Sequence, residues 1–385
     1  MKEYPLYTIS IYFLALICLL GCGERKGPVS TNPGLQASKI AHAKGFSIHK
    51  EGDLTVLEVN APWPGAKKSF KYLLAPKERL ATMRIAAGTY DAVVGTPVDK
   101  MVLTSTTHIP AMEALGALGS LVGFPNPDLI SSPLARKLVD SGQVKDLGMN
   151  EGINTEIVLS LAPDVVMGFG INDTNRAYET LERAGIAVVY NGDWVEQTPL
   201  GKAEWIKFFA PFFQKEAEAD RIFSEIETAY LEARKLAKKA EHRPTVLTGG
   251  LYKDVWHVAG GESWFAQFLK DARGNYLWAD SPGTGGTGLG LEAVLVKAKD
   301  ADIWLNPSSH TSYRALAAAN PHHRQFKAFE NRKVYSNAIE KGEKGGILFY
   351  ELAPQRPDLV LRDLIHILHP ELLPDHRLLF FKPLD

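Results

Sequence analysis

The sequence predicts an α/β protein made of two Rossmann-like α/β lobes, bridged by a long rigid helix, with a ligand cleft between the lobes. Three observations support this fold class. Short apolar runs alternate with helical stretches, which is typical of parallel β-α units whose helices cover a sheet. A stretch from Ala203 to about Ala240 contains no glycine and separates two such series. With 385 residues, 45% of them hydrophobic, the chain can form two domains with buried cores.

The first lobe is expected over residues 45–200. Partly alternating apolar residues between Phe46 and Val59, on either side of Glu51-Gly52-Asp53, predict a β-hairpin. A helix is expected around residues 111–117. The β-α alternation that follows rests on short apolar runs at residues 101–103, 121–123, 161–167 and 184–190.

The bridging helix is expected over residues 201–241, with room for a shorter helix before it. Good helix formers dominate this stretch. Its apolar positions recur at spacings of three and four, so one stripe should pack on a core; they are Ile222, Phe223, Ile226, Ala229, Tyr230 and Ala233. The second lobe, residues 242–385, resumes the β-α alternation. A continuous helix resists bending, so the lobes are expected to open only modestly.

The first 22 residues have the layout of a lipoprotein signal peptide. The apolar run from about Tyr7 to Leu20 is shorter than the roughly 20 residues of a permanent membrane span. It ends in Leu19-Leu20-Gly21-Cys22, which resembles a bacterial lipobox, so Cys22 is expected to carry lipid. An ordinary signal peptide with a chance cysteine is the alternative. Residues 23–44 are polar and are expected to form a flexible tether.

Composition and motifs argue against several other functions. Lys plus Arg total 43 and Asp plus Glu total 44, so there is no basic excess for nucleic acid binding. The glycine-rich run 283–288 lacks the lysine of a phosphate loop, and a flexible loop at the cleft mouth is expected there. The pair His322-His323 is expected at the surface, and no metal site is predicted. The mature chain would also lack a thiol, because Cys18 is removed with the signal peptide.

Five motifs occur in the order found in periplasmic binding proteins that import iron-siderophore complexes, haem and cobalamin. They are EIVLSLAPDVV (156–166), LERAGIAV (181–188), GESW (261–264) leading to Asn275, LEAVL (291–295) and ADIW (301–304). The chain resembles this family over about residues 80–370. The resemblance implies two lobes bridged by a rigid helix, with no cofactor and no chemical step.

The resemblance also implies a role and partners. An iron complex such as a ferric siderophore would bind between the lobes, and the loaded protein would dock on an ABC permease that is driven by its ATPase. Cobalamin or haem is the alternative ligand, and the sequence does not choose among them. The protein would be periplasmic and lipid-anchored to a membrane. A lipoprotein hydrolase on the same scaffold is the rival class, but no Gly-x-Ser-x-Gly motif occurs. A surface scavenger without an ABC partner is a third possibility.

Ligand contacts are expected from loops at strand ends that face the crevice between the lobes. Aromatic side chains there suit a large flat ligand, and Lys253 and Arg356 are candidates to offset an anionic chelate. By contrast, Trp205, Trp264 and Trp304 are expected in the core. The candidate ligand-binding residues are Thr106, Thr107, His108, Phe169, Trp194, Tyr252, Lys253, Trp256, His310, Tyr350 and Arg356.

Two glutamates are candidates for docking on the permease, because the family is expected to offer one from each lobe to arginines of its partner. Glu292 matches the family position at the start of the helix after the glycine-rich run. In the first lobe this chain has Ile109-Pro110 where the family has Thr-Glu. Glu113, about one helical turn later, is the expected substitute. A solvated helix N-terminus is the alternative explanation for both glutamates.

Overall fold

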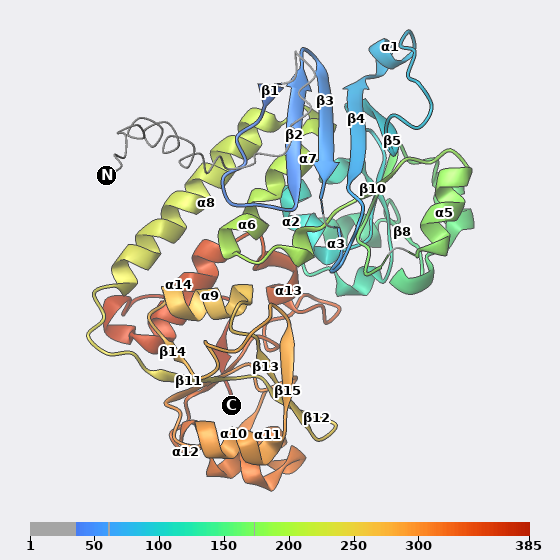
Figure 1. Cartoon of the computed structure of the whole chain (residues 1–385). Coiled ribbons are helices and arrows are strands. Elements are labelled where there is room, and N and C mark those ends of the chain that lie inside the picture. Colours follow the sequence, from blue (N-terminus) through green and yellow to red (C-terminus); the bar gives the residue numbers. More distant parts are fainter. Residues whose placement is uncertain (1–35, 61, 173) are drawn as a thin grey trace, which may run out of the picture. The chain divides into compact units, whose positions relative to one another are not determined.

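The computed structural model describes residues 36–60, 62–172 and 174–385 (Figure 1). The predicted signal peptide, Cys22 and the first part of the expected tether lie outside the described residues. In the described part of the chain we find no helix that combines a bilayer-spanning length with an apolar sequence.

An N-terminal sheet precedes the first parallel sheet and has the strand order β1-β2-β3-β4-β5. The expected hairpin is confirmed, because β2 and β3 pair antiparallel, with Phe46 opposite Val59. The sheet is larger than predicted, since β4 pairs antiparallel with β3 and parallel with β5. Its elements are β1 (Gln36–Ala37), β2 (Phe46–Glu51), β3 (Leu54–Val59), β4 (Phe70–Pro76), α1 (Lys77–Leu80) and β5 (Ala92–Thr96).

The first lobe contains a parallel sheet with the order β10-β9-β6-β7-β8. The chain runs from β6 to β7 on one side and later returns to β9 on the other side of β6. The expected strand runs are confirmed. The strands are β6 (Met101–Leu103), β7 (Leu121–Phe124), β8 (Lys145–Asp146), β9 (Val165–Gly168) and β10 (Val188–Tyr190). The helices are η1 (Thr106–His108), α2 (Ile109–Ala114), η2 (Leu118–Ser120), η3 (Pro127–Leu129), α3 (Pro133–Asp140), η4 (Asn150–Gly152), α4 (Thr155–Leu161), α5 (Arg176–Arg183) and η5 (Asp193–Val195).

The bridging helix is shorter than expected over residues 201–241, and two short helices precede it rather than one, so three helices connect the lobes. They are α6 (Pro199–Glu204), α7 (Ile206–Phe213) and α8 (Glu216–Ala237). Pro211 lies inside α7, and Gln214 ends it in the left-handed conformation, which stops a continuous helix before α8. The predicted apolar stripe lies on α8. Phe223 and Ile226 join the core of the first lobe, and Tyr230 and Ala233 join the core of the second. One helix is therefore part of both cores.

The second lobe contains a sheet with the order β14-β11-β16-β17-β18, parallel except for β18. An antiparallel sheet of β12, β13 and β15 adjoins it. The strands are β11 (Thr245–Thr248), β12 (Gly250–Tyr252), β13 (Val255–Ala259), β14 (Asn275–Tyr276), β15 (Gly286–Leu289), β16 (Ile303–Leu305), β17 (Val334–Ser336) and β18 (Lys382–Pro383). The helices are α9 (Trp264–Asp271), α10 (Leu291–Ala298), α11 (Tyr313–Ala319), η6 (Pro321–Gln325), α12 (Lys327–Glu330), α13 (Leu348–Leu352), α14 (Pro357–Leu368) and η7 (Pro370–Leu372).

Two predictions in this lobe need correction. Part of the glycine-rich run is not a loop but strand β15, which pairs with β13. His323 is not a surface residue: it is buried, and its Nδ1 lies 2.7 Å from the Leu316 carbonyl oxygen. The exact boundaries between the lobes stay predictions, because the chain from Gln36 to Asp385 is one compact unit.

The segment before β2 is held by two buried glutamates, so the expected tether of residues 23–44 is wrong at its C-terminal end. The fully buried Glu204 accepts hydrogen bonds from the backbone N–H groups of Ala41, His42 and Ala43 at 2.7–3.1 Å. Glu196 accepts from Lys44 and Gly45 in the same way. Polar composition alone predicted flexibility here, because a distant carboxylate that satisfies backbone amides leaves no local signal.

A second buried carboxylate contact joins the lobes directly. Glu351, on α13 of the second lobe, accepts hydrogen bonds from the N–H groups of Ser131 at 2.6 Å and Ser132 at 2.7 Å. We call these three residues the interlobe latch. The Ser132 hydroxyl donates to Glu113 on α2 at 2.5 Å. Burial raises the pKa of Glu351 to about 7 although both amides favour the charged form, and the nearby Glu113 adds to the rise.

The raised pKa predicts a pH-dependent contribution of Glu351 to stability. Because the folded pKa lies above the ordinary value near 4.5, the fold favours the protonated form, and this contribution is lost as pH rises through about 7. Relative to Glu351→Gln, the wild type should therefore lose up to about 3 kcal/mol of unfolding free energy between pH 4 and pH 8. Denaturant unfolding of both proteins across this range measures the difference. A difference in unfolding free energy that stays constant from pH 4 to pH 8 would contradict the raised pKa of Glu351.

Candidate functional site

The carboxyl end of the first parallel sheet carries one wall of the candidate site. Strands β6 and β9 are neighbours, but the chain leaves β6 toward β7, so their ends form a topological switch point, where α/β sheets bind ligands. Thr106 and Thr107 follow β6, and Phe169 follows β9; all three are half-buried. Thr104 joins the two ends, because its hydroxyl oxygen accepts from the Phe169 N–H at 3.1 Å.

The carboxyl end of the second parallel sheet carries a hollow of about 460 Å³. It too lies at a switch point, since β11 and β16 are neighbours while the chain continues from β11 toward β14. None of its lining residues carries a formal charge. They are Thr248, Gly249, Ala259, Trp264, Phe265, Asn306, Ser308, Ser309, Asn337, Ala338, Ile347, Phe349 and Tyr350. The wall therefore combines aromatic surface with neutral hydrogen-bonding groups.

These two walls meet at α13 and at Lys202. Helix α13, which carries Tyr350, lies against η1 of the first lobe. Lys202 donates hydrogen bonds to the carbonyl oxygens of Asp193 at 2.9 Å and Trp194 at 3.0 Å. The same ammonium lies 5.2 Å from the centroid of the Trp264 ring, which lines the second-lobe hollow. The Trp194 loop and the second-lobe hollow are thus adjacent.

Lys202 is a buried cation beside these aromatic residues. Burial lowers its pKa to about 8, while Asp193 and Glu196 act in the opposite direction. Because its ammonium is already bonded to two carbonyl oxygens, it holds the Trp194 loop in place. Trp194 itself is 39% exposed and is available to a ligand.

Four of the predicted ligand residues follow strands of the first lobe: Thr106, Thr107, Phe169 and Trp194. A fifth, Tyr350, lines the second-lobe hollow from α13. The structure does not bring the other six to the same surface. Three of them lie on the β12–β13 hairpin. Tyr252 and Lys253 are at its exposed tip, and Trp256 is in β13 with no exposed surface. Placing Trp256 on a loop was wrong, because Val255–Ala259 pairs with both β12 and β15.

The remaining three predicted residues do not line the second-lobe hollow. His108 is fully buried against Phe209, and burial lowers its pKa. His310 follows β16 but does not line the hollow. Arg356 forms a bidentate pair with Asp358, with bonds of 2.9 and 2.7 Å. Lys253 and Arg356 therefore supply no charge to the second-lobe hollow.

Sequence reasoning missed several residues of the hollow. Trp264 was assigned to the core, yet it is half-buried and lines the hollow, whereas Trp205 and Trp304 are in the core as predicted. Asn306 and Ser308 both have positive φ values, 57° each, in the turn after β16. The signal in the sequence was the short polar turn directly after the buried strand β16. Of this turn only His310 was predicted to bind the ligand, whereas Asn306, Ser308 and Ser309 line the hollow.

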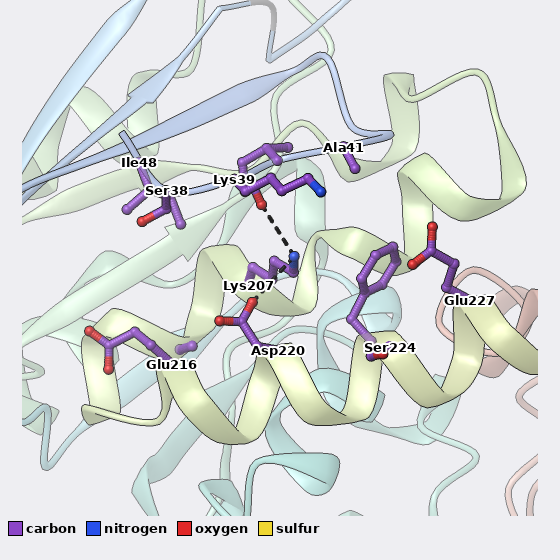
Figure 2. Close-up of a pocket in the computed structure, with 12 residues that line it drawn as sticks. Ser38, Lys39, Ala41, Ile48, Lys207, Glu216, Asp220, Ser224 and Glu227 are labelled. Carbon is purple, nitrogen blue, oxygen red and sulfur yellow. Dashed lines mark hydrogen bonds and ion pairs between the residues drawn. The ribbon is translucent and has the colours of Figure 1, made fainter. Parts of the chain in front are cut away.

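Among the other hollows of the described residues, two adjoin α8. One, of about 350 Å³, is a seam between Ser38–Ala41 and α8 (Figure 2). Figure 2 shows Lys207 reaching the Lys39 carbonyl oxygen beside Asp220. Glu216 and Glu227 are paired with Lys50 and His42. Because these side chains are paired with one another within the chain, the seam holds the N-terminal segment to α8. The other, of about 540 Å³, is a groove beside α8 that contains Glu113, Glu351 and Arg356.

The candidate docking glutamates differ in their surroundings. Glu292 is exposed in the first turn of α10, and Val296, one turn later, is 90% exposed. Glu113 is half-buried in the groove beside α8 and already accepts a hydrogen bond from Ser132. Glu156 is exposed in the first turn of α4. Helix α4 leads into β9, which neighbours β6, and helix α10 leads into β16, which neighbours β11. Because β6 and β11 are the first strands of their parallel sheets, Glu156 and Glu292 occupy equivalent positions in the two lobes.

Comparison with known proteins identifies the family. Residues 102–337, more than half of the chain, match the periplasmic binding protein family. The chain is similar to an uncharacterized lipoprotein of Methanocaldococcus jannaschii, 28% identical over 298 residues that cover 75% of this chain and 69% of the relative.

Similar solved structures share the fold at low sequence identity. A periplasmic haem-binding protein from Pseudomonas aeruginosa has a TM-score of 0.56 and 19% identity, covering 75% of this chain and 98% of that chain. A possible iron-binding, periplasmic solute-binding protein from Staphylococcus epidermidis has a TM-score of 0.55 and 16% identity, covering 71% of this chain and 100% of that chain. A periplasmic vitamin B12 binding protein from Vibrio cholerae has a TM-score of 0.51 and 15% identity, covering 71% of this chain and 97% of that chain.

These proteins bind and carry substrates, and they are not enzymes. The predicted class of two α/β lobes with a cleft between them is confirmed. The chain belongs to the periplasmic binding protein family.

Proposed function

We propose that this chain captures a metal chelate of low net charge, an iron complex such as a ferric siderophore, for an ABC importer. The observation that carries the proposal is the uncharged aromatic hollow at the β11–β16 switch point, next to the Trp194 loop of the other lobe. Aromatic rings bury much surface of a large flat ligand, and the neutral polar groups fix its orientation.

Charge distinguishes the ligand classes. The hollow has no arginine or lysine in its lining, and the nearby Lys202 ammonium is bonded to two carbonyl oxygens, so a strongly anionic chelate would lose its hydration without a free cation to pair with. A chelate of low net charge avoids this cost. A corrinoid is the second candidate for the same reason, and a structural neighbour is named as a vitamin B12 binding protein. Haem, whose two carboxylates need partners, fits this wall less well.

Binding requires no chemical step from the protein. The chelate would lie between the two walls, and its contacts with both lobes would favour the closed arrangement over an open one. The core shared through α8 keeps the lobes in register, because bending that helix would disturb both cores. We therefore expect small interlobe motion on binding.

The delivery step depends on anchoring and docking. We propose that Cys22 carries the lipid anchor outside the cytoplasmic membrane, which agrees with the name of the archaeal relative as a lipoprotein. We also propose that α10 contacts the permease of the importer through Glu292 and the exposed Val296. In the first lobe, the free carboxylate of Glu156 suits this role better than Glu113, which is bonded within the chain.

The ligand site is tested by two tyrosines of equal exposure. Tyr350 lines the hollow and Tyr252 is at the hairpin tip, and both are 59% exposed. Tyr350→Ala should weaken binding of the chelate about tenfold, because an aromatic contact worth about 1 kcal/mol or more is lost. Tyr252→Ala should change the affinity for the chelate less than twofold. Calorimetry with a ferric trihydroxamate, cyanocobalamin and haem measures both effects. Equal losses in the two variants would place the ligand elsewhere.

The lipid anchor is tested by Cys22→Ser. Acylation needs the thiol, and multiple acyl chains hold a protein at a membrane far better than one. The variant should leave the detergent phase in a phase-partitioning assay, while the wild type enters it. Equal partitioning of the two proteins would refute the lipid anchor.

Docking is tested by three charge reversals. Glu292→Arg and Glu156→Arg should reduce chelate uptake by cells at least fivefold and leave the affinity of the purified protein unchanged. Glu113→Arg should act differently, because it disturbs the hydrogen bond to Ser132 beside the interlobe latch. Uptake that survives the Glu292 and Glu156 reversals would exclude the docking role. Lost affinity would place these residues in the ligand site.

A further inference from the structure

Helix α13 is a short element with two different faces. Ile347, just before it, and Phe349 and Tyr350 line the second-lobe hollow. Leu348, Glu351 and Leu352 line the groove beside α8. The two sets of side chains therefore line different hollows, the first in the second lobe and the second beside α8. Figure 1 shows α13 between the two parallel sheets.

The hollow-facing side anchors α13 to its own lobe. The Phe349 ring is buried and packs against Phe380 and Phe381, with ring centroids 5.9 and 5.5 Å away. It also lies 5.8 Å from the Trp264 ring. Because these partners are all second-lobe residues, α13 must move with the second lobe if the lobes separate.

The groove-facing side binds α13 to the first lobe. The Glu351 carboxylate accepts both amides of the interlobe latch, and Ser131 and Ser132 are themselves buried. The Ser131 hydroxyl adds a bond to the Gly346 carbonyl oxygen at 3.0 Å. A Cβ at Gly346 would lie 2.0 Å from the Leu129 carbonyl oxygen, so the two backbones meet without intervening side chains.

We propose that Glu351 is a positioning residue that holds the Tyr350 side of α13 against η1, and thereby completes the ligand site. It contacts no ligand itself. Its bonds to Ser131 and Ser132 fix the spacing between Tyr350 on one lobe and Thr106 and Thr107 on the other. This inference rests on the proposed function of the hollow as the ligand site.

The variant Glu351→Ala tests the inference, with Glu343→Ala as the matched control. Glu343 is an exposed carboxylate in the same segment before α13. Glu351→Ala should speed amide hydrogen exchange at Ser131, Ser132 and η1 at least tenfold, and exchange in β9 and β16 should stay unchanged. Glu351→Ala should also weaken, by about tenfold, the binding of whichever chelate of the panel the wild type binds. Glu343→Ala should have neither effect.

A double-mutant cycle separates positioning from general destabilisation. If Glu351 acts through Tyr350, the variant Glu351→Ala/Tyr350→Ala should bind no more weakly than Tyr350→Ala alone. Additive losses would overturn the inference, as would unchanged exchange at η1 in Glu351→Ala. If Glu351→Ala does not fold, Glu351→Gln, which keeps one acceptor oxygen, replaces it in both measurements.

The two proposals can fail separately. If no chelate of the panel binds the wild type, the proposed function fails, and exchange at η1 alone decides the inference about Glu351. Increased exchange at Thr106–His108 in Glu351→Ala would then support the positioning of α13, and unchanged exchange would refute it.

Discussion

Buried carboxylates that accept backbone N–H groups hold the irregular segments of this chain to its two sheets. Glu204 and Glu196 bind the amides of Ala41–Gly45, and Glu351 binds those of Ser131 and Ser132. Asp363 binds the amides of Leu379–Phe381 near the C-terminus. Each carboxylate satisfies two or three amides that no strand or helix pairs. Removing one would leave two or three backbone donors without this partner, at a cost of about 1–3 kcal/mol for each donor that is shielded from water.

The direction of the parallel strands then decides where a ligand can bind. All strands of the first parallel sheet point the same way, so Thr106 after β6, Phe169 after β9 and Trp194 after β10 gather at one edge. The same rule gathers Asn306 and Asn337 in the second lobe. The latch and Lys202 bring these two edges together. The resulting site is neutral and aromatic, and the charged groups Glu351 and Lys202 stabilise its walls without lining the hollow.

The sequence was sufficient to predict features with a local pattern. The β2–β3 hairpin, the β-α alternation and the apolar stripe of α8 all follow from periodicity. The buried Trp256 was misplaced because a hairpin tip at Lys253-Asp254 resembles a loop, although the tryptophan next to it pairs on both sides. The roles of Glu204, Glu351 and Lys202 had no local signal. Their partners are 162, 220 and 9 residues away in the chain, and charged side chains are usually at the surface.

The central claim is that the chelate binds between the β11–β16 switch point and the Trp194 loop. Anomalous diffraction at the metal absorption edge, from crystals of the protein with its chelate, locates the metal directly. We predict one anomalous peak per chain, between the side chains of Tyr350 and Trp264 on one lobe and Trp194 on the other. A peak in the seam between Ser38–Ala41 and α8, or in the groove beside Glu113, would contradict this account.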